Sequence, residues 1–233
     1  MKVFGISDLH LSSSGEKPMD VFGPAWAGHR EKVESNWRAA VGPDDLVLLP
    51  GDLSWAMTLD EARPDLDFVG SLPGAKYFIH GNHDFWFSSP ARVRAVLPSS
   101  MHLVRNDAAA YGRVGICGVR GWLWPGQPDY GPATDEKHWR RSVLRLRLSL
   151  DALRVLDWDV AVALFHYPPR GAAAETELTQ MVREAGVRYC IYGHLHGENA
   201  ARAFEGERGG VLYRCVSADH VDFTPAALFE HGG

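Results

Sequence analysis

The sequence Tyr77-Phe78-Ile79-His80-Gly81-Asn82-His83-Asp84 joins a short apolar run to a cluster of polar side chains. The apolar residues are typical of a buried strand, and an amide, an imidazole and a carboxylate follow at three consecutive positions. Gly-Asn is also common in turns, so taken alone this stretch indicates only a turn after a strand. A metal site needs partners from elsewhere in the chain.

Four further polar clusters follow apolar runs in the same way. They are Asp8-Leu9-His10, Gly51-Asp52, His166 and Gly193-His194-Leu195-His196. Alternate residues of an extended chain face the same side, so Asp8 and His10 can reach one ion. Together with Asn82 and its neighbours, the clusters supply the ligands of a centre that holds two metal ions.

The side-chain types narrow the choice of metal. The clusters contain oxygen and nitrogen donors without a thiolate, which favours Mn, Fe or Zn, admits Ni, and disfavours a closed structural zinc site. A carboxylate has two oxygens, so one Asp can bridge two ions about 3.5–4 Å apart. We therefore expect two divalent metal ions as cofactors, Mn²⁺ or an Fe/Mn pair before Zn²⁺ or Ni²⁺.

The composition bounds the architecture and the partners. A chain of 233 residues, 45% hydrophobic, can bury a large α/β core, and we expect a single domain over residues 1–233. The formal net charge of −5 argues against nucleic acid or a membrane surface as a partner. Three widely spaced cysteines indicate buried thiols in a reducing compartment. No apolar stretch is long enough for a membrane span or a signal-peptide core, so we expect a cytoplasmic protein.

Apolar runs and helical periodicities alternate along the chain. Strands are expected at residues 3–6, 46–49, 75–79, 114–119, 160–165, 187–192 and 211–217. Helices are expected over about 28–40, from a capping box at 58–61, at about 89–97, at about 135–156, and in a segment that Gly186 closes. Pro64 predicts a bend or a restart in the second helix. The segments 11–28 and 120–130 are typical of loops.

This alternation predicts the fold class and the place of the site. Strands that alternate with helices predict an α/β fold. We expect a layered α/β/β/α sandwich in which helices flank two mixed sheets. Because the polar clusters come directly after strands, we expect the site at the strands' carboxyl ends.

The five clusters, taken in order, resemble the motifs of the calcineurin-like metallophosphoesterase superfamily. The resemblance runs from the first strand to Gly197, and its strength lies in five ordered motifs rather than in any one of them. It implies a phosphohydrolase of the compact bacterial type that acts on a small phosphoester. The implied reaction is in-line attack on phosphorus by a hydroxide held between two metal ions.

The resemblance also implies a role for each residue of the clusters. His83 would contact the substrate phosphate and protonate the leaving oxygen or stabilise its charge, and Asp84 would orient His83. The implied metal ligands are Asp8, His10 and His196 on the first ion, Asn82, His166 and His194 on the second, and Asp52 as the bridge. Asn82 and His83 would also touch the substrate.

Two departures from the superfamily's subgroups limit the substrate. Residues 51–55 lack the Gly-Asp-x-Val-Asp-Arg-Gly continuation of the protein Ser/Thr phosphatases, and His80 stands where those enzymes have Arg. A protein phosphatase is therefore not expected. The chain is also short beside the DNA-repair nucleases, which carry added capping domains.

Aromatic and basic residues outside the clusters admit two interpretations. Five aromatics can stack on a nucleobase, but core packing or a subunit contact that would make a homo-oligomer is the simpler expectation. These residues are Trp55, Trp86, Trp122, Trp124 and Tyr130. Arg120 and Arg170 can each bind a phosphate oxygen pair. The arginines of the 135–156 helix, Arg140, Arg141, Arg145 and Arg147, are expected on a solvated face rather than on a nucleic-acid surface.

The remaining histidines are weaker candidates. We expect surface or packing roles for His29, His102, His138 and His231, which have no partner spacing. His220 follows Asp219 at a strand end and is expected to support a metal ligand through a hydrogen bond.

Three functions remain open at this point. A metal-dependent phosphodiesterase for small diesters, such as cyclic nucleotides, fits a site without an added domain. A phosphomonoesterase or a nuclease of the same superfamily is the alternative, and a nuclease would lose affinity steeply with salt. A metal-binding scaffold without activity is disfavoured because every motif position, including His83, is filled.

Overall fold

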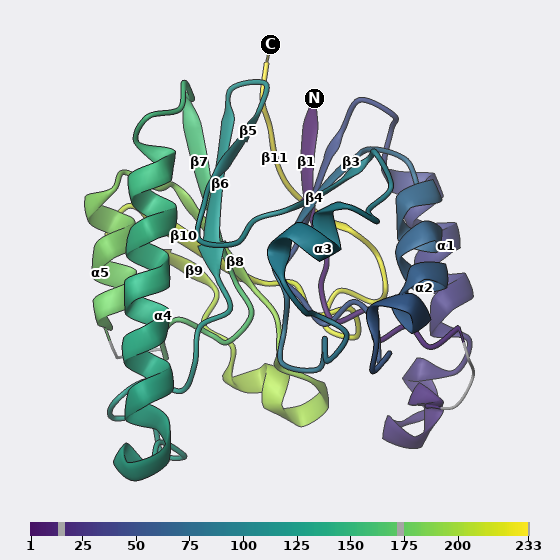
Figure 1. The fold of residues 1–233 in the computed structure, drawn as a ribbon, viewed down its shortest axis with the longest axis horizontal. Coiled ribbons are helices and arrows are strands. Elements are labelled where there is room, and N and C mark those ends of the chain that lie inside the picture. The colour runs from purple at the N-terminus through teal and green to yellow at the C-terminus, as the bar shows by residue number, and fades with distance from the viewer. Residues whose placement is uncertain (14–16, 172–174, 233) are drawn as a thin grey trace.

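The computed structural model describes residues 1–13, 17–171 and 175–232, which form four layers in the order helices, sheet, sheet, helices (Figure 1). The helices are α1 (His29–Ala40), α2 (Leu59–Ser71), α3 (Pro90–Arg94), α4 (Pro132–Leu153) and α5 (Glu177–Glu184), with short 3-10 turns η1 (Met19–Phe22), η2 (Pro24–Trp26) and η3 (Gly197–Arg202). The expected α/β/β/α sandwich is confirmed.

The two sheets are both mixed. The first has the order β11-β1-β2-β3-β4, and all its neighbours are parallel except β11. The second has the order β5-β6-β7-β8-β10-β9, with β5 and β9 antiparallel at its edges. The strands are β1 (Lys2–Gly5), β2 (Leu46–Leu49), β3 (Ala75–Phe78), β4 (Met101–Leu103), β5 (Ala109–Tyr111), β6 (Val114–Val119), β7 (Val160–Phe165), β8 (Tyr189–Tyr192), β9 (Gly206–Arg208), β10 (Val211–Cys215) and β11 (Ala226–Glu230).

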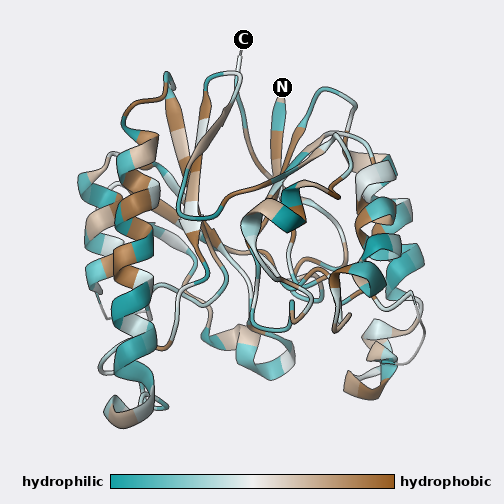
Figure 2. Ribbon diagram, viewed as in Figure 1, coloured by the Kyte–Doolittle hydropathy of each residue, from teal (hydrophilic) through white to brown (hydrophobic). Residues whose placement is uncertain are grey.

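The layers follow from two-residue alternation along buried strands. In β2, Val47 and Leu49 pack with α1 and α2, whereas Leu46 and Leu48 face the second sheet. In the second sheet Ala163 packs with α4 and α5, and its neighbour Leu164 faces the first sheet. Figure 2 shows the hydrophobic residues concentrated along these strands. Both faces of each central strand are therefore buried.

The helix α4 carries the clearest periodic signal in the sequence. Its expected apolar stripe is buried against the second sheet at every position, namely Trp139, Val143, Leu146, Leu150 and Leu153. The helix begins at Pro132 and ends at Leu153, three residues earlier at each end than the expected 135–156. Pro suits a first helical turn because its missing N–H has no partner there. None of the described helices is both long and apolar enough to cross a membrane.

Of the bend or restart expected at Pro64, the restart is not found. The helix α2 continues from Leu59 to Ser71 with Pro64 inside it. Thr58 caps its first turn by accepting a hydrogen bond from the Glu61 N–H. Pro64 and Asp60, the residue whose carbonyl loses its helical partner, are both exposed, so water can solvate that carbonyl.

Other differences lie in short elements. The helix α3 ends at Arg94 rather than near Leu97. The segment 11–28, expected as a loop, contains the 3-10 turns η1 and η2, while 120–130 is irregular as expected. Strands β4, β5, β9 and β11 were not expected, because three to five residues are too few for a clear alternation. The parallel strands end on the side of the molecule opposite the two termini (Figure 1).

Candidate metal centre

The five clusters all follow parallel strands and meet between the two sheets. Asp8 and His10 come after β1, Asp52 after β2, Asn82 to Asp84 after β3, His166 after β7, and His194 with His196 after β8. A parallel bridge between Ser7 and Ser217 joins the sheets beside Asp8. The topology thus brings residues from both halves of the chain to one edge, as expected for an open α/β sheet.

Main-chain hydrogen bonds hold the loops of the first sheet together. The Asp8 N–H donates to the Gly51 carbonyl at 2.9 Å, and the His10 N–H donates to the Asp52 carbonyl at 3.1 Å. The strand pairing of β1 with β2 therefore continues into the two loops, which sets the spacing of their carboxylates.

Two motif glycines make room for those carboxylates. A Cβ on Gly81 would lie 2.0 Å from Asp52 Oδ1, and a Cβ on Gly193 would lie 2.1 Å from Asp8 Oδ2. Both separations are far below a van der Waals contact, so only glycine fits. The glycines of the motifs are steric requirements of the site.

The backbone is strained at four of the candidate ligands. Asp8, His10, Asp52 and His194 have positive φ angles of 57°, 45°, 53° and 73°. Non-glycine residues seldom adopt this region, and such strain gathers at functional sites. The hydrogen bonds of the loops hold these residues there.

Two groups of side chains have metal-binding spacing, and they share Asp8. We call Asp8, His10 and His196 the open site, and Asp8, Asp52 and His166 the buried site. Asp52 Oδ2 lies 3.3 Å from His166 Nε2 and 3.9 Å from His10 Nε2, so it stands between the two groups.

The buried site is made of hydrogen-bond acceptors. His166 is fully buried, and its Nδ1 lies 3.0 Å from the Pro50 carbonyl, which can only accept, so Nδ1 carries the proton. The Nε2 then faces the Asn82 Oδ1 at 2.6 Å and an Asp52 oxygen that has no hydrogen-bond partner among the described residues, so a proton or a metal ion on Nε2 would meet two acceptors. Converging acceptors of this kind fit a cation.

The open site has a different support. His196 Nε2 lies 3.4 Å from both Asp8 Oδ1 and His10 Nε2, while its Nδ1 bonds Asp219 at 2.8 Å. Asp219 also accepts the Gly197 N–H at 2.9 Å. A carboxylate on the far nitrogen orients a metal-binding histidine and increases its basicity. The His196 side chain remains 31% exposed, against none for His166.

The pKa values of the histidines in the two sites are shifted in different directions. Burial alone would lower the pKa of His196, but the bonds to Asp219 and Asp8 outweigh it and raise the pKa to about 10. Burial likewise opposes the shift at His166, whose pKa is raised by Asp52. His10 lacks such a partner, and burial lowers its pKa to about 4. Positive charge is favoured where the carboxylates converge.

His194 lies at the rim of the buried site. Its ring centroid is 5.1 Å from that of His166 and 4.1 Å from that of Tyr167, and its N–H donates to Asp8. Burial lowers the pKa of His194 to about 4, which keeps the imidazole neutral and able to bind a metal.

His83 lies at the mouth of the site. Its N–H donates to Asp52 Oδ1 at 2.8 Å, and its ring centroid is 4.4 Å from that of Trp55. The ring Nδ1 is buried without a hydrogen-bond partner among the described residues. Burial lowers the pKa of His83 against the opposing charge of Asp52.

The role of Asp84 in orienting His83 stays a prediction, and the hydrogen bonds of its carboxylate lead elsewhere. Asp84 instead accepts hydrogen bonds from the N–H groups of Asp52, Leu53, Ser54 and Gly81 and from Trp86 Nε1. Burial and the nearby Asp52 raise the pKa of Asp84 to about 6, and the N–H groups of Gly81 and Ser54 oppose that shift. Asp84 therefore anchors the Asp52 loop.

The support for His196 was missed in the sequence. His220 was expected to act through a hydrogen bond, but its Nε2 lies 3.4 Å from Glu205, and the preceding Asp219 supports His196. A carboxylate after the last parallel strand of the sheet was the available signal. His29 is half-buried beside Trp26, and the ring of His138 stacks on Trp122.

The aromatics divide between core and cavities. Trp86 is buried in the core, whereas Trp55 stacks on His10 with ring centroids 4.8 Å apart. An aromatic cavity of about 360 Å³ adjoins the open site and is lined by His10, Met19, Phe22, Trp26, Trp55, His83, His196, Gly197 and Asp219. A second cavity of about 400 Å³ adjoins His194 and includes Trp124, Tyr167 and Arg170.

The chain matches the calcineurin-like phosphoesterase family over residues 1–198. No curated protein matches significantly.

Solved structures resemble the fold at low sequence identity. Phosphopantetheinyl hydrolase from Mycobacterium tuberculosis is 18% identical, with a TM-score of 0.56 over 93% of this chain and 88% of that one. A Thermus thermophilus protein is 13% identical, with a TM-score of 0.55 over 91% and 86%. A protein of unknown function from Aquifex aeolicus is 15% identical, with a TM-score of 0.50 over 97% and 95%. The family match, which includes all five clusters, shows that the chain belongs to the calcineurin-like phosphoesterase family.

Proposed function

We propose that this protein is a phosphodiesterase for small diesters, such as cyclic nucleotides, with a centre of two divalent metal ions. The observation that supports a diester as the substrate is the pair of cavities beside the two sites. One adjoins His10 and His196, and the other adjoins His194. A diester has an organic group on each side of its phosphorus, and each cavity has the volume of a small-molecule pocket.

The ligand assignment follows the two sites. Asp8, His10 and His196 would hold one ion, Asn82, His166 and His194 the other, and Asp52 would bridge them. Support comes from the 3.3 Å and 3.9 Å separations of Asp52 Oδ2 from His166 and His10. Two ions so held lower the pKa of a water and neutralise charge on the transferring phosphoryl group. Mn²⁺ or an Fe/Mn pair is the proposed occupant.

His83 is the proposed proton donor to the leaving oxygen. Its ring lines the aromatic cavity, and its buried Nδ1 has no partner among the described residues. The lowered pKa leaves the imidazole neutral in the free protein, and the negative charge of a bound phosphoester would raise that pKa. Asn82, the residue before His83, would also touch the phosphate.

The test compares two chromogenic substrates. The protein is stripped of metal, reloaded with Mn²⁺, Fe²⁺, Zn²⁺ or Mg²⁺, and assayed on bis(p-nitrophenyl) phosphate and p-nitrophenyl phosphate. We expect faster, metal-dependent cleavage of the diester, followed by turnover of cyclic nucleotides. Preference for the monoester would make the protein a phosphatase, and cleavage of DNA with steep salt dependence would make it a nuclease. No turnover with two metals bound would favour the scaffold.

A further inference from the structure

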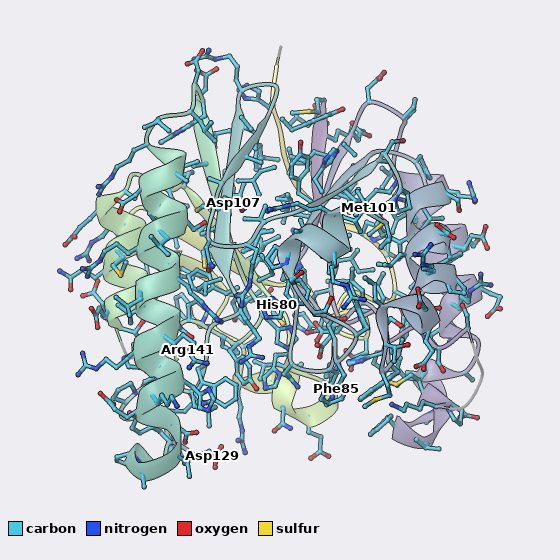
Figure 3. The ribbon with its side chains drawn as sticks, viewed as in Figure 1. His80, Phe85, Met101, Asp107, Asp129 and Arg141 are labelled. Carbon is cyan, nitrogen blue, oxygen red and sulfur yellow. The ribbon has the colours of Figure 1, made fainter. Side chains whose placement is uncertain are left out.

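Four arginines gather beside the site without carboxylate partners. This arginine cluster consists of Arg105 after β4, Arg120 after β6, and Arg141 and Arg145 on α4. Arg141 and Arg145 are one helical turn apart and so lie on one side of α4. Figure 3 labels Arg141 on α4 and His80 nearer the middle of the molecule. The cluster thus draws on both sheets and one helix.

The neighbours of the cluster are aromatic rather than acidic. Arg120 Cζ lies 5.0 Å from the Trp122 ring centroid, and Arg105 Cζ lies 5.6 Å from that of Phe87. Within residues 1–13, 17–171 and 175–232, no carboxylate forms an ion pair with any of the four side chains. On the same helix, by contrast, Arg140 pairs with Glu136 at 2.6 Å. Arg147, an exposed residue of the same helix, is also without an ion pair among the described residues, so half-burial rather than the missing pair distinguishes Arg105, Arg120 and Arg145.

Positive charges in the cluster oppose one another. Burial, and then the charges of Arg145, Arg120 and Arg141, lower the pKa of Arg105 to about 10. Burial and neighbouring arginines also lower the pKa of Arg145. Arg105, Arg120 and Arg145 are half-buried like charges, whereas Arg141 is exposed and the charge of Asp52 acts on Arg120. A bound anion would relieve the remaining repulsion.

A buried histidine adds an independent sign of a ligand. His80 is 7% exposed, and its Nδ1 has no hydrogen-bond partner in the described part of the chain. Its ring stacks on Phe87 at 4.4 Å, the same ring that Arg105 overlies. An unsatisfied buried polar group of this kind calls for a partner.

The cluster is connected to the metal centre. The Arg120 carbonyl accepts the N–H groups of His166 at 3.0 Å and Tyr167 at 2.8 Å. Trp122, under the Arg120 guanidinium, lies 5.2 Å from Tyr167, whose ring contacts His194. The Arg120 side chain is thus linked through Trp122 and Tyr167 to His194 at the rim of the buried site.

We propose that the arginine cluster binds a second phosphate group of the substrate, separate from the phosphoester that is hydrolysed. The inference rests on the proposed function and narrows its substrate to diesters that carry a further phosphate. Guanidinium groups suit this ligand because their paired N–H donors match phosphate oxygens. The carboxylates of the metal centre repel such an anion until metal is bound, so binding to the metal-free protein tests the cluster apart from the metal ions.

The kinetic test uses two substrates that differ by one phosphate. They are thymidine 5′-(p-nitrophenyl phosphate) and its 3′-phosphorylated form. We expect the metal-loaded protein to prefer the 3′-phosphate in kcat/KM, and Arg145→Gln to reduce this preference about tenfold, the effect of one lost charge-assisted hydrogen bond. Arg147→Gln removes an exposed charge of the same helix and should leave the preference unchanged. Equal kcat/KM for both substrates would overturn the proposal, whereas turnover of bis(p-nitrophenyl) phosphate tests the hydrolase function by itself.

A binding test is independent of turnover. In excess chelator, pyrophosphate should raise the Tm of the metal-free protein. Arg145→Gln should have a higher Tm than the unchanged protein without the anion, because repulsion is relieved, and should gain less from it. If Arg145→Gln instead had a lower Tm without pyrophosphate and gained as much from it as the unchanged protein, Arg145 would be a structural residue and the proposal would be wrong. Stabilisation by pyrophosphate together with equal kcat/KM values would replace the substrate subsite by a site for a free anion.

Discussion

The open and buried sites share Asp8 but are built on different principles. At the buried site, His166 is fully enclosed and held by the main-chain carbonyl of Pro50. At the open site, His196 is 31% exposed and held by the side chain of Asp219. A carbonyl is present whatever the side chain, whereas a carboxylate depends on one residue. The support of His166 at the buried site therefore depends on the main chain, whereas the support of His196 at the open site depends on the side chain at position 219.

The difference has a consequence for metal exchange. An ion beside His196 would border the aromatic cavity, while an ion beside His166 would contact a fully buried side chain. We expect the open site to bind and release its ion more readily, since opening the buried site requires loops from both sheets to move. The strained ligand backbone adds to the rigidity of the centre.

The largest expected effect comes from a change that affects both sites at once. Asp52→Ala removes the oxygen that faces His10 and His166, and it leaves the Asp84 anchor in place because that anchor bonds the Asp52 N–H. We expect loss of phosphoesterase activity on the order of a thousandfold, given that charge neutralisation by the metals contributes several kcal/mol. Steady-state kinetics with saturating metal measure this loss of activity. Activity within tenfold of the unchanged protein would show that Asp52 does not join the sites.

A change at Asp219 should weaken metal binding at one site and not at the other. Asp219→Asn weakens the support of His196 alone, and we expect about tenfold weaker binding of one metal ion with the other unchanged. Calorimetric titration of metal into the stripped protein resolves the two steps. Asp222→Asn, an exposed carboxylate in the following turn, is the matched control and should change neither step. Equal weakening of both steps would mean that the sites are not independently held.

The smallest expected effect concerns the wall of the open site. Trp55→Leu removes the ring stacked on His10 and is expected to cost about 1 kcal/mol, or roughly 2–4 °C in Tm. Thermal unfolding with and without metal measures it. Because Trp55 contacts His10 and His83 rather than a residue of the buried site, the loss should leave binding at the buried site intact. A change in the tighter metal-binding step would contradict this separation.

The main elements and the ligand types were predictable because their signals are local. The stripe from Trp139 to Leu153 and the apolar runs of the central strands are periodic over a few turns or residues, and these are the elements that formed as expected. The helix through Pro64 escaped prediction because the cost of a proline depends on whether water reaches the carbonyl it leaves free. That residues 1–233 form one domain stays a prediction.

The roles of neighbouring residues were harder to predict. Asp84 follows His83 directly, yet its carboxylate turns toward the Asp52 loop, where five donors converge. Asp219 reaches His196 across 23 positions of sequence. The positions of Asp84 and Asp219 in the sequence therefore did not predict which groups their carboxylates contact.

By itself the sequence determined which donor types occur and that each follows a strand, because motif spacing and strand alternation are local properties of the chain. Only the tertiary structure decided which histidine is buried, which carboxylate supports it, and which arginines lack a counterion. Burial and charge pairing depend on contacts between segments far apart in sequence, such as Pro50 with His166, or Arg105 with Arg145. Their energies depend on the surrounding solvent and charges, which exist only once both sheets and α4 are in place.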